Sequence, residues 1–234
     1  MNNYNEFAYF YTKGPYPAYS KKMAELLPSL FKHFRIKPLK ILDLACGEGT
    51  FAVEMAKKGY QLTGIDKSKD ILKYAKNQAK NAKVEINFLR KDMRDISFKT
   101  SFQLVTCWYD SLNYLLTSKD LEKAFTGVYA SLKEKGFFIF DMNTIYGLAV
   151  NWQQRKCYIQ QDTPELLEIH RPEYDYENNI AALNITCFRK KGNMWKRFDE
   201  QHRERAYPIT TIKTILKDNG FSLLACLGNI KKMS

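Results

Sequence analysis

The stretch that decides the fold is KILDLACGEGTFAVEMAKKGYQLTGID, residues 40–66. An apolar run from Ile41 to Leu44 leads into a loop with two glycines, and residues 50–58 then repeat their apolar positions with a helical period. Gly59 is placed to end that helix, and residues 60–66 are typical of a second strand that ends in an acid. The pattern predicts a βαβ unit with parallel strands.

The alternation of strand and helix continues. Strands are expected at residues 84–89, 102–108 and 137–141, and helices at 71–80, with Ser68 as the cap, and at 121–132. This order predicts a Rossmann-like, doubly wound α/β sheet. Two long strands at 179–189 and 194–207 then indicate an antiparallel β insertion after the fifth strand. A helix at 209–219 and a last strand at 221–227 complete the expected elements.

Composition narrows the class of protein. The chain has 234 residues, 45% of them hydrophobic, so it can bury a sizeable core. No run approaches the roughly 20 apolar residues of a membrane span, and the first residues lack the order of a signal peptide, so we expect a cytoplasmic protein. The five cysteines have no C-x-x-C spacing, which predicts reduced thiols and no metal site.

The net charge of +12 would suit a nucleic-acid partner. However, the lysines and arginines do not interleave with aromatic residues, so a lysine-rich solvated surface is the preferred interpretation and nucleic acid is not the expected partner.

The glycine loop at residues 45–49 is the strongest signal for chemistry. Glycines there let the backbone approach a ligand, and the helix that follows presents unpaired N–H groups. Gly47-x-Gly49-x-x-Ala52 also fits a dinucleotide fingerprint. Asp43 argues against a dinucleotide, because its carboxylate would repel a pyrophosphate. The same carboxylate suits a ligand that carries an ammonium and a sulfonium. Asp66, at the end of the next strand, can accept hydrogen bonds from ribose hydroxyls.

At these residues the sequence resembles the class I methyltransferases that depend on S-adenosyl-L-methionine (SAM), whose first motif, D-x-x-x-G-x-G, is matched by Asp43, Gly47 and Gly49. The resemblance implies SAM as the cofactor, Asp66 on its ribose, Asp92 at its adenine amino group and Met93 beside the adenine. The cofactor-binding residues that we expect are Tyr19, Asp43, Ala45, Cys46, Gly47, Gly49, Asp66, Lys67, Asp92, Met93 and Trp108.

A closer likeness, in residues 106–114, 132–141 and 197–207, is to small-molecule N- and O-methyltransferases of amino-sugar and glycine/sarcosine types. It implies a small-molecule methyl acceptor. It also implies three regions: an aromatic arm or lid and a helix (1–36), a SAM-binding core (37–145 and 206–234) and an insertion over the acceptor (146–205). One departure is that the family usually ends in a further hairpin strand. A partner subunit in a homodimer could cover the edge left open here.

Methyl transfer needs an oriented acceptor and, for an ammonium or hydroxyl, a base. On a strand, Glu200, His202 and Glu204 share one face, so His202 is a candidate base, and the alternative is a surface or packing histidine. Asp110 and Asn113 follow the fourth strand, where they could line the transfer site. The tyrosines of the arm could form a lid or simply pack.

Three alternatives stay open at this stage. Tyr129-x-x-x-Lys133 matches a spacing found in NAD-dependent dehydrogenases, although we interpret it as a coincidence. The positive charge would suit a nucleic-acid methyltransferase, although no separate basic module is present. A SAM-binding regulator without turnover is the third.

Overall fold

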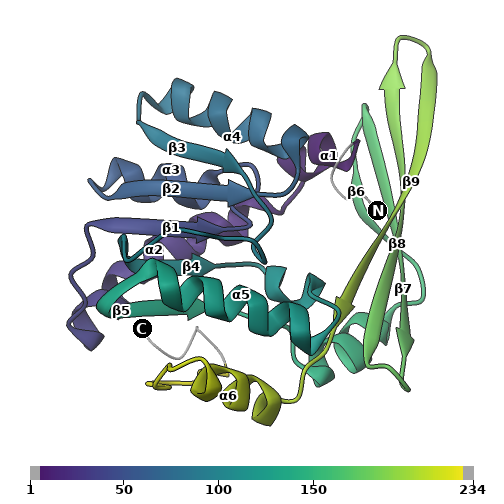
Figure 1. The fold of residues 1–234 in the computed structure, drawn as a ribbon. Coiled ribbons are helices and arrows are strands. Elements are labelled where there is room, and N and C mark those ends of the chain that lie inside the picture. The colour runs from purple at the N-terminus through teal and green to yellow at the C-terminus, as the bar shows by residue number, and fades with distance from the viewer. Residues whose placement is uncertain (1–5, 229–234) are drawn as a thin grey trace.

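The computed structural model describes residues 6–228, and its core is a parallel sheet with the strand order β3-β2-β1-β4-β5 (Figure 1). This confirms the predicted Rossmann-like, doubly wound class. The order places β1 and β4 at the centre, so the loops that follow these two strands meet at one edge of the sheet. The strands are β1 (Lys40–Leu44), β2 (Gln61–Asp66), β3 (Ile86–Arg90), β4 (Phe102–Cys107) and β5 (Leu132–Phe140).

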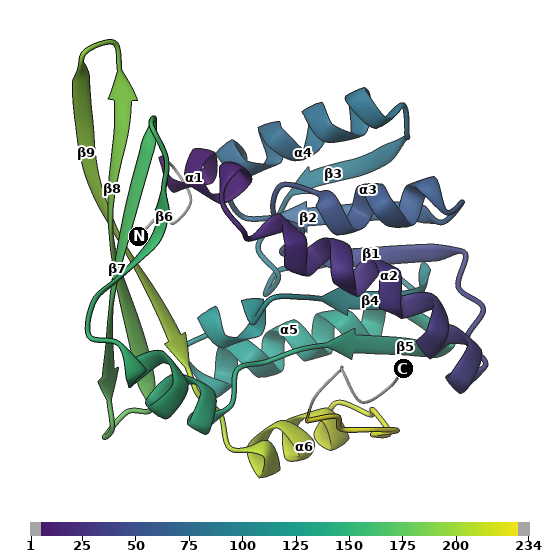
Figure 2. The same ribbon diagram turned by 180° about the vertical axis from the view of Figure 1, so that it is seen from behind.

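Helices cover both faces of this sheet (Figures 1 and 2). One buried cluster joins the sheet to α2 (Pro17–Phe34), α3 (Thr50–Lys57) and α4 (Lys69–Ala82), and a second joins it to α5 (Ser118–Ser131) and α6 (Ile209–Asp218). Ser68 caps α4 as predicted, because its side chain accepts a hydrogen bond from the Ile71 N–H at 3.3 Å. The apolar periodicity of these helices therefore predicted the faces that they bury.

A second, antiparallel sheet stands beside the carboxyl ends of the parallel strands (Figure 1). Its order is β6 (Tyr158–Asp162), β7 (Leu166–Asp175), β8 (Ile180–Lys191) and β9 (Met194–Arg205). The sequence predicted β8 and β9 but missed β6 and β7. In β7 the inward positions include Glu168, His170 and Pro172, so burial alternates along the strand while hydrophobicity does not.

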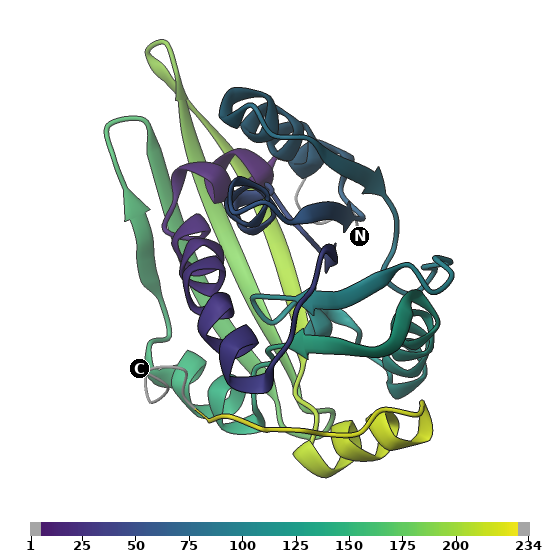
Figure 3. The same cartoon turned by 90° about the vertical axis from the view of Figure 1, so that its left-hand side faces the viewer.

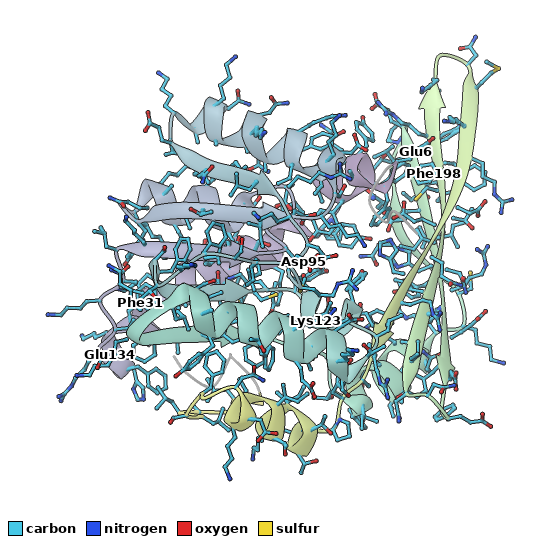
Figure 4. All side chains as sticks on the ribbon, viewed as in Figure 1. Glu6, Phe31, Asp95, Lys123, Glu134 and Phe198 are labelled. Atoms are coloured by element: carbon cyan, nitrogen blue, oxygen red, sulfur yellow. The ribbon has the colours of Figure 1, made fainter. Side chains whose placement is uncertain are left out.

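The short helix α1 (Phe7–Lys13) lies between the two sheets (Figures 1 and 2), and Figure 3 shows it in front of the long strands of the second sheet. Phe7 and Phe10 share a buried cluster with Ile185 and Cys187 of β8. Figure 4 labels Glu6 and Phe198 at this junction, and the Lys196 ammonium of β9 lies 2.8 Å from the Glu6 carboxylate. The aromatic segment is thus a packed helix rather than a free arm within the described residues, and residues 1–5 of that arm lie outside them.

The predicted strand at residues 221–227 is wrong, since this segment has no regular structure. It follows α6 without a neighbouring strand to pair with, and an apolar run alone does not make a strand. β5 pairs with β4 on one side and with no other described strand on its outer side. Three short helical turns complete the description: η1 (Ser111–Tyr114), η2 (Gly147–Asn151) and η3 (Trp152–Gln154).

Candidate active site

The loop between β1 and α3 adopts the backbone that its glycines permit. Gly47 and Gly49 have φ values of +56° and +87°, in the left-handed region that favours glycine. A Cβ on Gly49 would lie 2.9 Å from the Cβ of Ala75 in α4. Gly49 therefore serves helix packing, whereas a Cβ on Gly47 would meet only the end of Ile71, at 3.9 Å.

Asp66 ties this loop to the start of α4. Its Oδ2 accepts a hydrogen bond from the Gly47 N–H at 3.0 Å, and its Oδ1 accepts one from the Ser68 N–H at 2.8 Å. Burial raises the pKa of Asp66 to about 6, although these hydrogen bonds act in the opposite direction. The carboxylate is thus fixed by backbone donors at the place where a ribose-binding acid was predicted.

Asp43 is buried within the sheet, with 2% of its surface exposed. The Thr106 hydroxyl donates a hydrogen bond to its Oδ1 at 2.9 Å. Burial raises the pKa of Asp43 to about 8, and the nearby Glu48 and Asp66 act in the same direction. Three acids therefore share a poorly solvated region, which favours a cationic ligand group beside them.

A cavity of about 20 Å³ lies between the glycine loop and α1. Among the residues that border it, Trp108 is 7% exposed, and its indole N–H finds no hydrogen-bond acceptor within residues 6–228. A buried donor of this kind matches the carboxylate of an amino-acid moiety. The lining residues are Tyr11, Ser20, Asp43, Ala45, Cys46, Gly47, Glu48, Phe51, Trp108, Tyr109 and Ser111.

Asp92, the expected adenine ligand, follows β3 and is held by Arg94. The Arg94 guanidinium donates to Asp92 Oδ1 at 2.9 Å and to Oδ2 at 2.8 Å, and this pairing lowers the pKa of Asp92. Lys67 Nζ lies 3.8 Å from the same carboxylate. Met93 is half-buried against the core cluster of α5. The sequence reasoning missed Arg94, which lies only two residues after Asp92.

A second group of acids lies where β4, β5 and β9 end. Asp141 Oδ1 and Oδ2 accept hydrogen bonds from the N–H groups of Tyr109 and Asp110, at 2.7 and 3.0 Å. Burial raises the pKa of Tyr19, and the nearby Asp141 and Asp110 carboxylates act in the same direction. Burial raises the pKa of Asp110, with Glu204 and then Asp141 as further causes, and burial raises the pKa of Glu204 to about 8.

Asn113 braces these segments rather than pointing an open amide at a ligand. Its Nδ2 donates to the carbonyl oxygens of Asn143 and Arg205, at 3.0 and 2.8 Å, and its Oδ1 accepts from the Asn143 N–H at 2.9 Å. Asn143 in turn donates to Asp110 at 2.7 Å and to Glu204 at 3.0 Å. Asp141 and Asn143 were missed, although the end of the strand beside β4 was a usable signal.

His202 of β9 is buried beneath α1, with 2% of its surface exposed. Its Nδ1 lies 2.8 Å from the Tyr114 hydroxyl, and its Nε2 lies 3.2 Å from a Glu200 oxygen. The Phe7 ring packs against it with centroids 5.2 Å apart. The structure thus brings His202 to the sheet face that looks toward α1 and the end of β4.

The Tyr129–Lys133 pair does not form one helix face, because α5 ends at Ser131 and Lys133 belongs to β5. Tyr129 is 52% exposed and packs against Phe221. Within residues 6–228, no helix is long and apolar enough to cross a membrane, and no cluster of three or more potential metal ligands occurs.

Comparisons with known proteins agree with this geometry. Residues 41–136 match a family model described as a methyltransferase domain. A putative methyltransferase of Bacillus subtilis, YqeM, is 31% identical over 226 residues, which cover 94% of this chain and 87% of the relative.

Solved structures give the same result. A SAM-dependent methyltransferase from Clostridium acetobutylicum superposes with a TM-score of 0.79 at 30% identity, covering 93% of this chain and 87% of that one. A sugar N-methyltransferase from Streptoalloteichus shares the fold with a TM-score of 0.74 at 13% identity, covering 94% and 85%. The chain therefore belongs to the SAM-dependent methyltransferases, with SAM as its cofactor.

Proposed function

We propose that this enzyme methylates a nitrogen or oxygen of a small molecule. The observation that carries the proposal is the covered site: the cofactor loop and Asp110 follow strands of the parallel sheet, while the buried His202 of the antiparallel cap packs against Phe7 of α1. A covered, largely buried site suits a small acceptor better than a nucleic acid. A relative named as an amino-sugar N,N-dimethyltransferase, 26% identical over 56% of this chain, supports the same acceptor class.

The division of the chain follows the same logic. We propose that residues 37–145 and 206–234 form the SAM-binding core, residues 1–36 the helical cover and residues 146–205 the cap over the acceptor. The parallel sheet lies in the first region, α1 and α2 in the second, and β6 to β9 in the third. This assignment also predicts that loop changes in the cap alter the acceptor without altering SAM binding.

Within the core, we propose that Asp43 binds the ammonium of SAM, Trp108 its carboxylate, Asp66 its ribose and Asp92 its adenine. We propose that the other cavity residues surround the methionine part, that Met93 lies beside the adenine, and that Lys67 and Tyr19 also contact the cofactor. When bound, SAM supplies an electrophilic methyl carbon next to a positive sulfur. The buried carboxylates and aromatic rings exclude water and favour that positive charge.

On the acceptor side, we propose that His202 takes the proton that the acceptor loses, with Glu200 stabilising the resulting imidazolium. Asp110 and Glu204 orient the acceptor, while Asn113 acts as a positioning residue through Asn143. We also propose that the enzyme acts in the cytoplasm, where its five cysteines would stay reduced.

The first experiment is a parallel titration with SAM, S-adenosylhomocysteine and NADH, followed by melting temperature and calorimetry. We expect SAM and S-adenosylhomocysteine to raise the melting temperature, because a ligand that binds only the folded state stabilises it by about 2.7 kcal/mol at 100 times its Kd. Release of S-adenosylhomocysteine in a screen of amines and alcohols would then identify the acceptor. A response to NADH alone would contradict the cofactor assignment, and SAM binding without turnover would point to a regulator.

We further propose that the enzyme is a homodimer in which a second copy covers β5. A groove of about 1740 Å³ lies beside this strand and is bordered by α2, α6 and residues 220–227. Leu223 and Leu224 on its margin are 49% and 63% exposed. A strand edge that no described strand pairs, beside exposed leucines, favours association, because both the backbone groups and the apolar surface are stabilised when covered.

Sedimentation equilibrium tests this proposal. We expect a species of twice the 27.4 kDa chain mass at micromolar concentration, and a shift toward monomer in Leu224→Asp. Lys83→Asp, at the far end of α4, is the control and should leave the dimer unchanged. A wild-type protein that stays monomeric at every accessible concentration would refute the homodimer.

A further inference from the structure

A buried polar network joins β7 to the junction between α1 and α2, and the roles assigned above use none of its members. Glu168 is fully buried, and its carboxylate accepts hydrogen bonds from the Tyr16 hydroxyl and from the Gln161 amide. His170, 2% exposed, contacts the same carboxylate through Nε2, and its Nδ1 lies 3.1 Å from the Tyr158 hydroxyl. Such a network is costly to build unless every member is satisfied.

Tyr16 links this network to the residues that border the cofactor cavity. Its ring stacks on Tyr11 with a centroid distance of 4.7 Å and an interplanar angle of 9°. It also meets the Tyr109 ring edge-on, at 6.4 Å and 79°. Tyr11 and Tyr109 both border the cavity. Tyr16 therefore packs against two rings of the cavity wall.

The chain around Tyr16 is closely held. A Cβ on Gly14 would lie 3.0 Å from Cε2 of Tyr16 and 3.1 Å from Nε2 of Gln161. The Gln161 amide also donates to the carbonyl oxygen of Phe10, in α1, at 3.3 Å. The strands β6 and β7 thus contact both sides of the turn that links α1 to α2.

The cavity is small. Its volume of about 20 Å³ is close to the space that one water molecule needs, which is less than the methionine part of SAM occupies. Tyr11 places α1 at the border of this cavity. α1 has seven residues, and a helix shorter than about 12 residues depends on tertiary contacts for its place.

We propose that Glu168 and His170 are positioning residues that, through Tyr16, hold α1 closed over the cofactor cavity, and that release of Tyr16 admits and discharges SAM. We call Tyr16, Glu168 and His170 the Tyr16 latch. The inference rests on the SAM site of the proposed function. It assigns the β insertion a second task besides covering the acceptor, namely control of cofactor exchange.

The latch has a kinetic signature that a purely structural contact lacks. Because the contact holds the closed state both with and without SAM, weakening it raises the open fraction of both forms. In Tyr16→Phe we expect the association and dissociation rate constants for SAM each to rise about tenfold, because the closed state loses roughly one hydrogen bond. We expect Kd to change by less than about threefold. Glu168→Gln should act in the same direction.

Stopped-flow fluorescence would give both rate constants, and hydrogen exchange of α1 in the SAM-free protein would give a second readout that needs no ligand. Tyr174→Phe is the matched control. It also removes a tyrosine hydroxyl, one that donates a hydrogen bond to Asn179 at 3.2 Å at the far end of β7. It should leave the SAM rate constants and the hydrogen exchange of α1 unchanged.

The outcomes are distinguishable. Wild-type protein that does not bind SAM would remove the SAM site, and the latch with it. Wild-type binding with unchanged rates in Tyr16→Phe, or with slower association and a raised Kd, would overturn the latch alone. A lower melting temperature in Tyr16→Phe without faster exchange of α1 would assign the network to stability only.

Discussion

Asp43→Asn is expected to weaken SAM binding by about 100-fold and at the same time to make the SAM-free protein more stable at pH 8. The affinity falls because a neutral amide replaces the carboxylate proposed to face the ammonium, and charged hydrogen bonds contribute about 1.5–3 kcal/mol. The stability rises because Asp43 is buried and its pKa is raised by that burial to about 8. Asparagine keeps the oxygen that accepts from Thr106 without the charge.

The pH dependence fixes the sign of the stability effect. In the unfolded chain Asp43 ionises near its ordinary pKa of 3.8, whereas in the folded protein it does so near 8. Between these values the folded state binds more protons, so the free energy of unfolding of the wild type falls as the pH rises. We expect Asp43→Asn to gain about 5 kcal/mol at pH 8 and less than about 1 kcal/mol at pH 4, since each unit of pKa difference corresponds to about 1.4 kcal/mol.

Urea unfolding at the two pH values, together with calorimetry of SAM binding, checks both effects. Asp95→Asn, at an exposed position after β3, removes a carboxylate without the burial and should change neither quantity. Unchanged SAM affinity in Asp43→Asn would place the ammonium elsewhere. Unchanged stability at pH 8 would mean that the carboxylate is compensated by a group other than Thr106.

His202→Ala is expected to lower kcat by at least about 100-fold while Kd for SAM stays within about twofold, because removal of a general base affects proton transfer and not the cofactor pocket. His202 is buried, with the Tyr114 hydroxyl at Nδ1 and a Glu200 oxygen at Nε2. Release of S-adenosylhomocysteine with the identified acceptor gives kcat, and calorimetry gives Kd.

His33→Ala, at an exposed position of α2, is the control and should resemble the wild type. Equal losses of turnover and SAM affinity in His202→Ala would show that the histidine supports Phe7 and α1 rather than the chemistry. The split between kcat and Kd therefore decides between the catalytic and the packing interpretation left open by the sequence.

Most of the core could be predicted because its signals are local. The strands β1 to β4 are short segments of five or six residues, and each helix buries a periodic stripe, so these elements and the Ser68 cap followed from short windows. The errors lie where the signal depends on neighbours. β7 was missed because its inward Glu168 and His170 are paired polar groups, and residues 221–227 were expected as a strand although no strand pairs with them.

The residues of the candidate site also fall into those that local patterns predicted and those that they missed. Asp43, Gly47 and Asp66 lie within one βαβ unit, so their spacing alone placed them together. Asp141 and Glu204, which share a buried region with Asp110, are far from it in sequence and meet it only because β5 lies beside β4 and β9 ends against η1. A local sequence pattern cannot predict such a contact between distant residues.

The sequence by itself determined the fold class, the position of the glycine loop and the acids that mark a SAM-dependent methyltransferase, since each of these depends on residues close together in the chain. Only the tertiary structure decided that α1 lies between the two sheets, that His202 is buried against Phe7 and that Tyr16 meets Glu168 across 152 positions of sequence. The physical reason is that burial and pairing of polar groups belong to contacts between distant elements, and those contacts form only when the sheets pack.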